Sequence, residues 1–516
     1  MEAASLGLAV VGVIEMCRKY GNRLVSLCRQ YRQLDTGLDE IILAIQGSWL
    51  KLEVQLKSLK SLWDTLQPQL QVLYHDVLTR LRTKLEAATE NFTETQEQRD
   101  VAFNVRQKLK VVYLKRQLTE TVADIEEWQR RFDPSWYLIA RIASPVIDMK
   151  LHSVPTGQQD LPSMRLVRMR DSIKQISSQG AEPTEPIFKD ATTIMGQMCR
   201  VEGTNAYLSR YRYSNTTRRI LLDPANSAGQ TTTATARLNV RDLARLLLYI
   251  DPMTFNLLRC DGVVEIRTDQ GNQFHLLFEI PEGLSSPRTL RHLLAASPKC
   301  SLSHRFQLAK QLARSVMFVH AAGFVHKNIR PETVLVFEDD SANTLGPSFL
   351  IGFERIRRAE GRTDQSGDLQ WEKNLYRHPL RQGSQPEDIF EMRHDVYSLG
   401  VCLLEMGLWS SFVCLENEGS TPVPWSGLGI DEALVANDQR RGAFAVKSQL
   451  VTLSKDLLPA MVGERYTSVV IACLCCLDDS EDNSFRDDES MQDRDGIIVG
   501  VRYIENVLLK LEELFA

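Results

Sequence analysis

The feature that most constrains the fold is a set of apolar residues between positions 42 and 66 that recur at alternating steps of three and four. These residues are Ile42, Ile45, Trp49, Leu52, Leu56, Leu59, Trp63 and Leu66. This spacing places all of them on one face of a helix, in the pattern by which helices pack against each other. We therefore expect a long helix that buries this face against neighbouring helices.

The sequence around this helix predicts more helices of the same kind. Pro68 suits the first turn of a following helix, whose apolar positions Leu70, Leu73, Val77, Leu81 and Leu85 repeat the spacing. A further helix is expected over residues 100–131. Long helices joined by short turns favour an antiparallel bundle. We predict an all-α helical bundle over residues 1–143.

The rest of the chain has a different composition and predicts a second domain. At 516 residues the chain is too long for a single hydrophobic core. Residues 144–185 are rich in Pro, Ser, Gln and Gly and predict a linker with one brace helix. Short strand-like runs follow at 219–222, 263–266 and 274–278, and the last part is mostly helical. The expected fold class is α+β multidomain, with the second domain over residues 186–516.

The net charge, the first residues and the cysteine spacing indicate which partners, cellular location and metal sites to expect. The net charge of -5 gives no global reason to expect a nucleic-acid partner. Met1 and Glu2 provide no basic segment before the apolar stretch that follows, so we expect no secretory signal and a cytoplasmic protein. The clustered Cys473, Cys475 and Cys476 lack a second pair at zinc spacing, and we expect no metal site.

The second domain contains motifs that resemble those of protein kinases, in the right order. The stretch His326-Lys327-Asn328-Ile329-Arg330-Pro331-Glu332-Thr333 resembles the catalytic loop HRDLKPEN. Gly352-Phe353-Glu354 corresponds to the DFG triplet, and Asp395 begins a stretch like the large buried helix of the C-lobe. The resemblance implies a bilobal domain, with an N-lobe at about 186–281 and a C-lobe at about 282–516. It also implies that His326 and Phe353 pack in the core and that Asp395 hydrogen-bonds the loop backbone.

The residues at the phosphate-handling positions differ from those of active kinases. They are Asn328 for the catalytic aspartate, Arg330 for the loop lysine, Thr333 for the metal-binding asparagine and Gly352 for the metal-binding aspartate. An amide cannot act as the proton acceptor. Glu354 lies two positions beyond Gly352, and in an extended segment its register does not suit the missing carboxylate.

The predicted N-lobe also lacks the residues that hold nucleotide phosphates. No lysine occurs between Lys189 and the predicted hinge near residue 279, so no lysine can serve the third strand. The helix expected over 240–249 has no glutamate, and a glycine-rich phosphate lid is missing. We predict a pseudokinase, which is not an enzyme and has no cofactor, although weak metal-independent ATP binding stays open.

The order of bundle, linker and degenerate kinase resembles the mixed lineage kinase domain-like proteins that execute necroptosis, and more closely their fungal relatives that carry a HeLo domain. The resemblance also rests on the stretch Leu6-Gly7-Leu8-Ala9-Val10-Val11-Gly12-Val13-Ile14. It implies a pseudokinase that controls a membrane-permeabilising, death-inducing bundle, as in heterokaryon incompatibility. It further implies an upstream immune-type receptor or activator, homo-oligomerisation, and movement from the cytoplasm to the plasma membrane.

The resemblance implies that the first helix is buried in the resting bundle and inserts into membrane on activation. The inserting residues would be Leu6, Leu8, Val10, Val11, Val13 and Ile14. Nine apolar residues span about 14 Å as a helix, half of a hydrocarbon core of roughly 30 Å, so they cannot cross a bilayer alone. The basic residues expected to contact anionic lipid headgroups are Arg18, Lys19, Arg106, Lys108, Lys110, Lys115 and Arg116.

Two other functions stay open from the sequence. The basic clusters could equally be solvated helix faces, in which case both domains would only bind partners and the protein would be a kinase-fold adaptor or scaffold without membrane activity. The third alternative is an active atypical protein kinase, which the missing phosphate-binding groups disfavour.

Overall fold

The computed structural model describes residues 3–30, 36–97, 187–213, 216–225, 233–268, 271–296, 299–340, 344–358, 370–414, 421–430, 439–479, 483–486 and 497–515, apart from isolated positions, together with parts of 115–171. The chain divides into two compact units, Met1–Arg170 and Asp171–Ala516, which we call the helical unit and the mixed unit. The division falls inside the segment 144–185. The domain bounds proposed from the sequence stay predictions.

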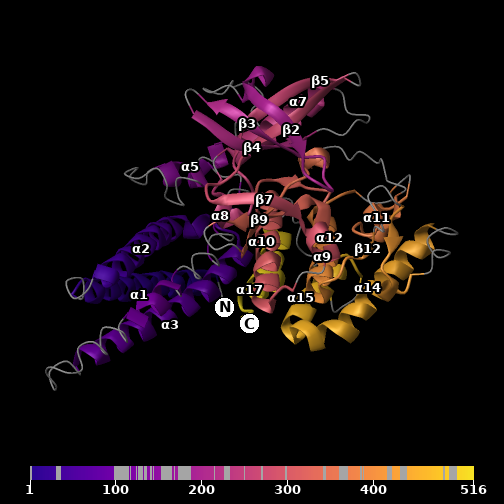
Figure 1. Cartoon of the computed structure of the whole chain (residues 1–516). Coiled ribbons are helices and arrows are strands. Elements are labelled where there is room, and N and C mark those ends of the chain that lie inside the picture. The colour runs from indigo at the N-terminus through magenta and orange to yellow at the C-terminus, as the bar shows by residue number, and fades with distance from the viewer. Residues whose placement is uncertain are drawn as a thin grey trace. The chain divides into compact units, whose positions relative to one another are not determined.

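The helical unit is built from long helices (Figure 1). Its described helices are α1 (Ala3–Arg29), α2 (Thr36–Leu62), α3 (Pro68–Glu97) and α5 (Pro145–His152). The predicted seam lies on α2 and continues to Trp63 and Leu66, and its members are at most 6% exposed. Helix α1 packs against α2 and α3. Of the helix expected over 100–131, the described positions are helical and the remainder lies outside the described residues.

A glycine sets how closely α1 approaches α2. A Cβ atom at Gly21 would lie 2.1 Å from the ring of Trp49, which is far inside van der Waals contact. Trp49 Nε1 donates a hydrogen bond to Asn22 Oδ1 at 2.9 Å. The indole ring of the seam therefore packs directly on the backbone of α1, and only glycine leaves room for it.

The first part of the mixed unit is a six-stranded sheet covered by a helix (Figure 1). Its strands are β1 (Phe188–Lys189), β2 (Ile194–Arg200), β3 (Tyr207–Tyr213), β4 (Thr216–Pro224), β5 (Cys260–Thr268) and β6 (Gly271–Glu279), in the order β1-β5-β6-β4-β3-β2. Only β1 pairs in parallel. Helix α7 (Thr233–Leu247) packs against β5 and β6. It starts before the expected position 240 because its first four residues are only Thr and Ala, whose small side chains give a weak periodic signal.

Most of the remaining mixed unit is helical. Its longer described helices are α9 (Leu290–Ala296), α10 (Leu302–Ala321), α12 (Met392–Leu408), α14 (Gln439–Val462), α15 (Glu464–Leu474) and α16 (Ile497–Tyr503), with the single-turn helices α8 (Pro252–Phe255), α11 (Trp371–Asn374) and α17 (Leu509–Glu512). All residues of α12 except Arg393 are buried, so this helix forms the centre of the core.

Short strands complete this part of the mixed unit. They are β7 (Leu284–Thr289), β8 (Phe324–Val325), β9 (Val334–Asp339), β10 (Thr344–Leu350), β11 (Arg357–Arg358), β12 (Val413–Cys414) and β13 (Val423–Pro424). Strand β9 pairs antiparallel with both β10 and β7, while β8 pairs with β11 and β12 with β13. The loop 326–333 runs from β8 to β9, and the segment 352–354 follows β10. The antiparallel pairing of β9 and β10 therefore brings these two segments together.

Candidate functional site

A buried carboxylate holds the start of the loop 326–333. Asp395, in the first turn of α12, accepts hydrogen bonds from the backbone N–H of His326 at 2.7 Å and of Lys327 at 2.9 Å. The ring of His326 packs against that of Phe353, with centroids 4.9 Å apart. Burial disfavours the imidazolium form and lowers the pKa of His326 to about 3. The His326 side chain is therefore a neutral core residue.

The middle of the loop is joined to the segment 352–354 by side-chain hydrogen bonds. Asn328 Nδ2 donates to the carbonyl oxygen of Gly352 at 3.1 Å and to Glu354 Oε1 at 3.3 Å. The hydroxyl of Thr333 lies 2.8 Å from the carbonyl oxygen of Asn328 and 2.9 Å from that of Arg330. Both side chains are thus engaged in holding the loop and the segment in place.

The segment 352–354 is not extended, contrary to the expectation from sequence. Gly352 has a φ of +84°, and Phe353–Arg355 form a single 3-10 turn. This turn buries Phe353 and aims the Glu354 carboxylate at Asn328. A Cβ atom at Gly352 would lie 2.5 Å from Thr333 Cγ2, so glycine is required both by its backbone conformation and by the space available.

Sequence reasoning missed Asp223, the residue that joins the six-stranded sheet to this segment. Asp223 lies near the end of β4 and is 2% exposed. Its Oδ2 accepts hydrogen bonds from the backbone N–H of Gly352 at 2.8 Å and of Phe353 at 3.1 Å. Burial raises the pKa of Asp223 to about 7, against the effect of these two hydrogen bonds, and the nearby charge of Glu354 adds to the rise.

A second link from the sheet reaches Glu354. Asn205, in the turn between β2 and β3, donates from Nδ2 to Glu354 Oε2 at 3.3 Å. Glu354 therefore accepts one hydrogen bond from the loop and one from the turn. The side chains that meet at this point are two carboxylates, two amides and a hydroxyl, an arrangement that would repel a phosphate group rather than attract it.

Glu332, from the same loop, belongs to a separate buried cluster around Arg291. The Arg291 guanidinium pairs with Glu332 at 3.1 Å and with Glu405 at 2.8 Å. It also donates to Tyr376 Oη at 2.5 Å and to Ser411 Oγ at 2.7 Å. Although burial acts in the opposite direction, the guanidinium keeps the pKa of Glu332 below its ordinary value. This cluster fastens the loop to α9 and α12.

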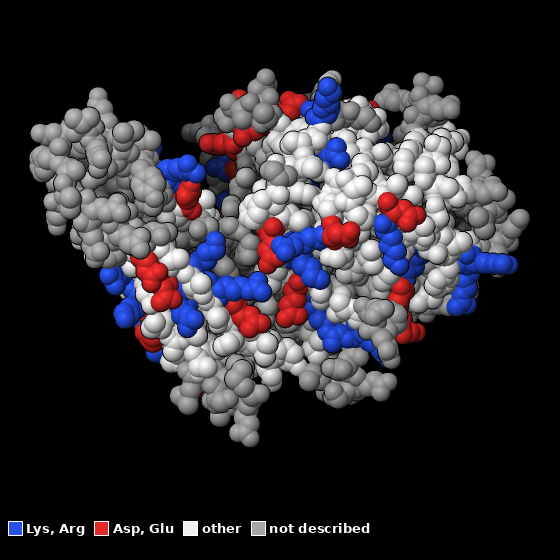
Figure 2. Space-filling view, turned by 90° about the horizontal axis from the view of Figure 1, so that it is seen from below, with Lys and Arg blue, Asp and Glu red and all other residues white. Residues whose placement is uncertain are grey.

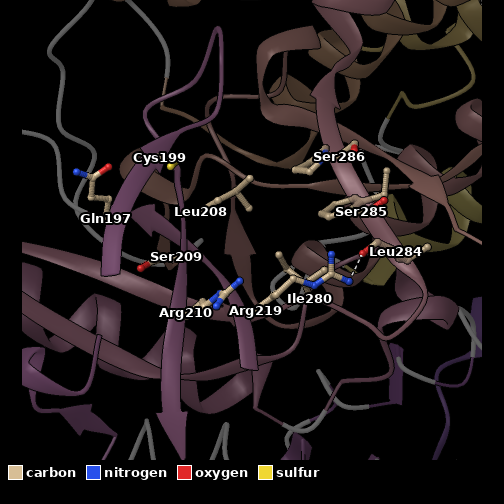
Figure 3. A pocket seen from close by; sticks show the side chains of 12 residues that line it. Gln197, Cys199, Leu208, Ser209, Arg210, Arg219, Ile280, Leu284, Ser285 and Ser286 are labelled. Carbon is tan, nitrogen blue, oxygen red and sulfur yellow. Dashed lines mark hydrogen bonds between the residues drawn. The ribbon is translucent and has the colours of Figure 1, made fainter. Parts of the chain in front are cut away.

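A cavity of about 440 Å³ lies between strands β2, β3 and β4 of the sheet and a wall made by Ile280, β7 and Phe337 of β9 (Figure 3). Arg219, on β4, donates from Nη2 to the carbonyl oxygen of Leu284 at 2.8 Å across it. The residues that line the cavity are Gln197, Cys199, Leu208, Ser209, Arg210, Arg219, Ile280, Leu284, Ser285, Ser286, Pro287 and Phe337.

The residues predicted to insert into membrane lie on α1. Val10 and Ile14 are 0% exposed, and Val11 and Val13 are half-buried. The side chains of Leu6 and Leu8 are outside the described residues. None of the helices, where the structure describes them, is long and apolar enough to cross a membrane.

The predicted headgroup contacts differ in their surroundings. Arg18 pairs with Glu15 at 3.1 Å and with Glu53 of α2 at 3.5 Å, whereas Lys19 is exposed. Lys115 and Arg116 are exposed, and Arg116 pairs with Glu120 at 2.9 Å. Arg106, Lys108 and Lys110 lie outside the described residues. On the face drawn in Figure 2, the described basic and acidic side chains are interspersed.

In the described part of the chain, no three His, Cys, Asp or Glu side chains are grouped so that they could hold a metal ion. Cys473 and Cys476 are buried, and burial raises the pKa of both thiols. The thiol of Cys476 donates a hydrogen bond to the carbonyl oxygen of Arg393 at 3.1 Å.

Comparisons with known proteins find protein kinases over a short part of the chain. The eukaryotic translation initiation factor 2-alpha kinase 1 of Rattus norvegicus is 27% identical over 120 residues, which is 22% of this chain and 18% of that protein. The Mus musculus protein of that name is 28% identical over 120 residues, with the same shares. A probable serine/threonine-protein kinase of Clostridium acetobutylicum is 26% identical over 136 residues, 26% of this chain and 19% of that protein.

The chain spans less than a fifth of the length of these curated relatives. No family model matches it. The similarity is therefore weak and partial, and it indicates a kinase-like protein with an N-terminal helical region and a C-terminal part that contains β-sheet.

Proposed function

We propose that the mixed unit is a pseudokinase, a kinase-like domain that transfers no phosphate. The observation that carries this proposal is the position of Asp223. Strand β4 is the third strand of the antiparallel run β2-β3-β4 that precedes α7, and Ile220-Leu221-Leu222-Asp223 corresponds to the V-A-I-K motif of kinases. In a kinase the lysine of that motif pairs with nucleotide phosphates. Here a carboxylate stands in its place.

The loop supports the same proposal. The amide of Asn328 donates to Gly352 and Glu354, so it serves as a hydrogen-bond donor where a kinase needs a proton acceptor. The hydroxyl of Thr333 is hydrogen-bonded to carbonyl oxygens of the loop, at the position where a kinase needs a metal ligand. The positions that would handle phosphate are occupied by contacts that hold the fold together.

The test is a phosphotransfer assay on the full chain with labelled ATP, magnesium or manganese, and a generic protein substrate. We expect no incorporation above the level of a heat-denatured sample, and no change on Asp223→Asn. Metal-dependent incorporation that Asp223→Asn abolishes would show that the site is catalytic and would overturn the proposal. Weak nucleotide binding without metal would be compatible with it.

We further propose that the mixed unit controls a membrane-perturbing helical unit whose release causes cell death. On this proposal the protein is cytoplasmic at rest, and an upstream receptor or activator triggers its homo-oligomerisation at the plasma membrane. The supporting observation is how α1 is held. Val10 and Ile14 are buried, but Glu15 reaches Lys60 of α2 through an ion pair of 2.7 Å in which the two side chains are 45% and 42% exposed. Exposed pairs stabilise little, typically about 0.2–1 kcal/mol, so this pair adds only a small part to the hold that the buried side chains have on α1, and its loss would weaken that hold without removing it.

Dye leakage from vesicles tests this proposal and distinguishes it from an adaptor role. Lys60→Glu places like charges on α1 and α2 and should increase leakage from vesicles that contain phosphatidylserine, whereas neutral vesicles should leak less. Lys51→Glu is the matched control, because it makes the same charge change at an exposed lysine of the same helix. Val10→Glu should abolish leakage. If none of these proteins leaks the anionic vesicles, the adaptor function remains.

A further inference from the structure

Two arginines face each other without a carboxylate between them in the cavity beside the sheet. Arg210 on β3 is the direct cross-strand partner of Arg219 on β4, and both line the cavity (Figure 3). Like charges directly opposite each other destabilise a sheet. None of the 12 lining residues is an Asp or Glu. The pair therefore concentrates positive charge, and a bound anion would reduce the repulsion between the two guanidinium groups.

The rest of the lining suits the apolar body of a small molecule. Leu208, Ile280, Leu284, Pro287 and Phe337 supply apolar surface. The volume of about 440 Å³ falls within the range of roughly 300–1,000 Å³ that small-molecule sites occupy. One lining residue, Ser286, has a φ of +46°, a conformation that non-glycine residues rarely adopt and that often marks functional sites.

We propose that this cavity binds a small organic anion, a carboxylate or phosphate monoester on an apolar body. The anionic group lies between Arg210 and Arg219, and the body lies against Leu208, Ile280 and Phe337. The proposal does not depend on whether the mixed unit transfers phosphate.

The arrangement of charge along β4 favours a ligand with a single anionic group over a nucleotide polyphosphate. Arg219 and Asp223 lie four residues apart, about 14 Å at the rise of a strand. The carboxylates of Asp223 and Glu354 occupy one end and the arginine pair occupies the other. A polyphosphate directed toward Asp223 would be repelled, whereas a single anionic group at Arg219 would be attracted.

Isothermal titration calorimetry on the full chain with matched aromatic probes tests the proposal. The probes are 2-naphthoate, its neutral isostere 2-naphthamide, and 2-naphthyl phosphate. We expect both anions to bind on the order of tenfold more tightly than the amide, because charged hydrogen bonds to guanidinium groups are stronger than neutral ones. The ratio of carboxylate to phosphate affinity identifies which anion the site prefers.

Arginine variants locate the binding. Arg210→Gln and Arg219→Gln should bring the affinity for 2-naphthoate to that for 2-naphthamide. Arg212→Gln removes the same charge from the same strand, outside the cavity, and should change nothing. Equal affinity for the three probes, absence of binding, or a preference for anions that survives both arginine variants would each overturn the proposal.

Cys199 provides a second readout, because it is exposed and lines the cavity. Its alkylation by iodoacetamide, followed by peptide mass spectrometry, should slow at saturating 2-naphthoate in the unmodified chain but not in Arg210→Gln. Cys300, which is partly exposed and lies outside the cavity, is the internal control. Equal protection of Cys199 and Cys300 would contradict a ligand in this cavity.

Discussion

Two buried aspartates in the mixed unit make the same contact in different surroundings. Asp395 accepts from the backbone N–H groups of His326 and Lys327, and Asp223 accepts from those of Gly352 and Phe353. Asp395 lies in the first turn of α12, where the helix dipole favours a negative charge. Asp223 lies at the end of a strand with Glu354 nearby, and its pKa is raised to about 7.

The comparison shows that equal hydrogen-bond geometry does not imply equal electrostatics. The loop start is tied to the helical core by a carboxylate in the first turn of a helix, where the helix dipole favours a negative charge. The segment 352–354 is tied to the sheet by a carboxylate whose charge is opposed by burial and by a like charge. We therefore expect the attachment of the sheet to depend on pH.

The largest effect is expected from Asp395→Ala. It leaves two N–H groups without their acceptor, and each such group costs about 1–3 kcal/mol, so the free energy of unfolding of the mixed unit should fall by about 2–6 kcal/mol. Urea unfolding of the full chain measures this, and hydrogen exchange at His326 and Lys327 should accelerate. Asp395→Asn keeps an acceptor oxygen, so its free energy of unfolding should fall by less. Unchanged exchange at these amides would contradict the role of Asp395.

Gly352→Ala should have the next largest effect, because Gly352 presents one of the N–H groups to Asp223. The new Cβ would collide with Thr333 in a backbone conformation with φ of +84°. We expect the free energy of unfolding to fall by about 2–3 kcal/mol. Gly323→Ala is the matched control, since Gly323 has a φ of +80° with nothing within 4 Å. It should lose about 1 kcal/mol from backbone strain alone. Equal losses would refute the steric contribution.

Asp223→Asn should change the pH dependence of stability. Because the native pKa is about 7 and the unfolded value is near 4, the native chain holds a proton in this window that the unfolded chain releases. The stabilisation is present below about pH 4 and is lost as the pH rises toward 7. As the pH rises through this window, the free energy of unfolding of the unmodified chain should therefore fall by on the order of 1–3 kcal/mol relative to that of the variant.

The measurement for Asp223 is the difference in free energy of unfolding between the two proteins at pH 5 and at pH 8. The pKa of His326 is lowered to about 3, so this residue destabilises the native state of both proteins as the pH falls below about 6.5. Taking the difference between the two proteins cancels this contribution. A difference that is the same at both pH values would show that Asp223 does not titrate in this range.

The smallest effect is expected from Glu354→Gln. It removes the negative charge that raises the pKa of Asp223, so the midpoint of the pH dependence should move down by less than about one pH unit. Asn205→Ala, which removes a hydrogen bond but leaves the Glu354 charge, should leave the midpoint in place. Equal midpoints for Glu354→Gln and the unmodified chain would assign the raised pKa to burial alone.

The parts of the fold that the sequence predicted depend on patterns within single segments. The three-and-four spacing from Ile42 to Leu66 indicated the buried face of α2, and Pro68 indicated the start of α3. The site was predictable where a motif of several adjacent residues exists, as around His326. It was not predictable at Asp223, because a single aspartate at the end of an apolar run does not indicate that its partners are backbone N–H groups about 130 positions away. Residues 352–354 were expected to be extended, but the left-handed Gly352 turns the chain into a 3-10 turn.

By itself the sequence indicated the long helices, three of the strands of the sheet, and which residue types stand in the loop 326–333. These depend on interactions between residues a few positions apart. Only the tertiary structure decided that Asp223 meets Gly352, that Asn205 meets Glu354, and that Arg210 and Arg219 face one cavity. The first two pairs are separated by 129 and 149 positions, and the pairing of strands sets which side chains meet. Even the pKa of Asp223 follows from that pairing, because burial arises only when distant segments enclose the group.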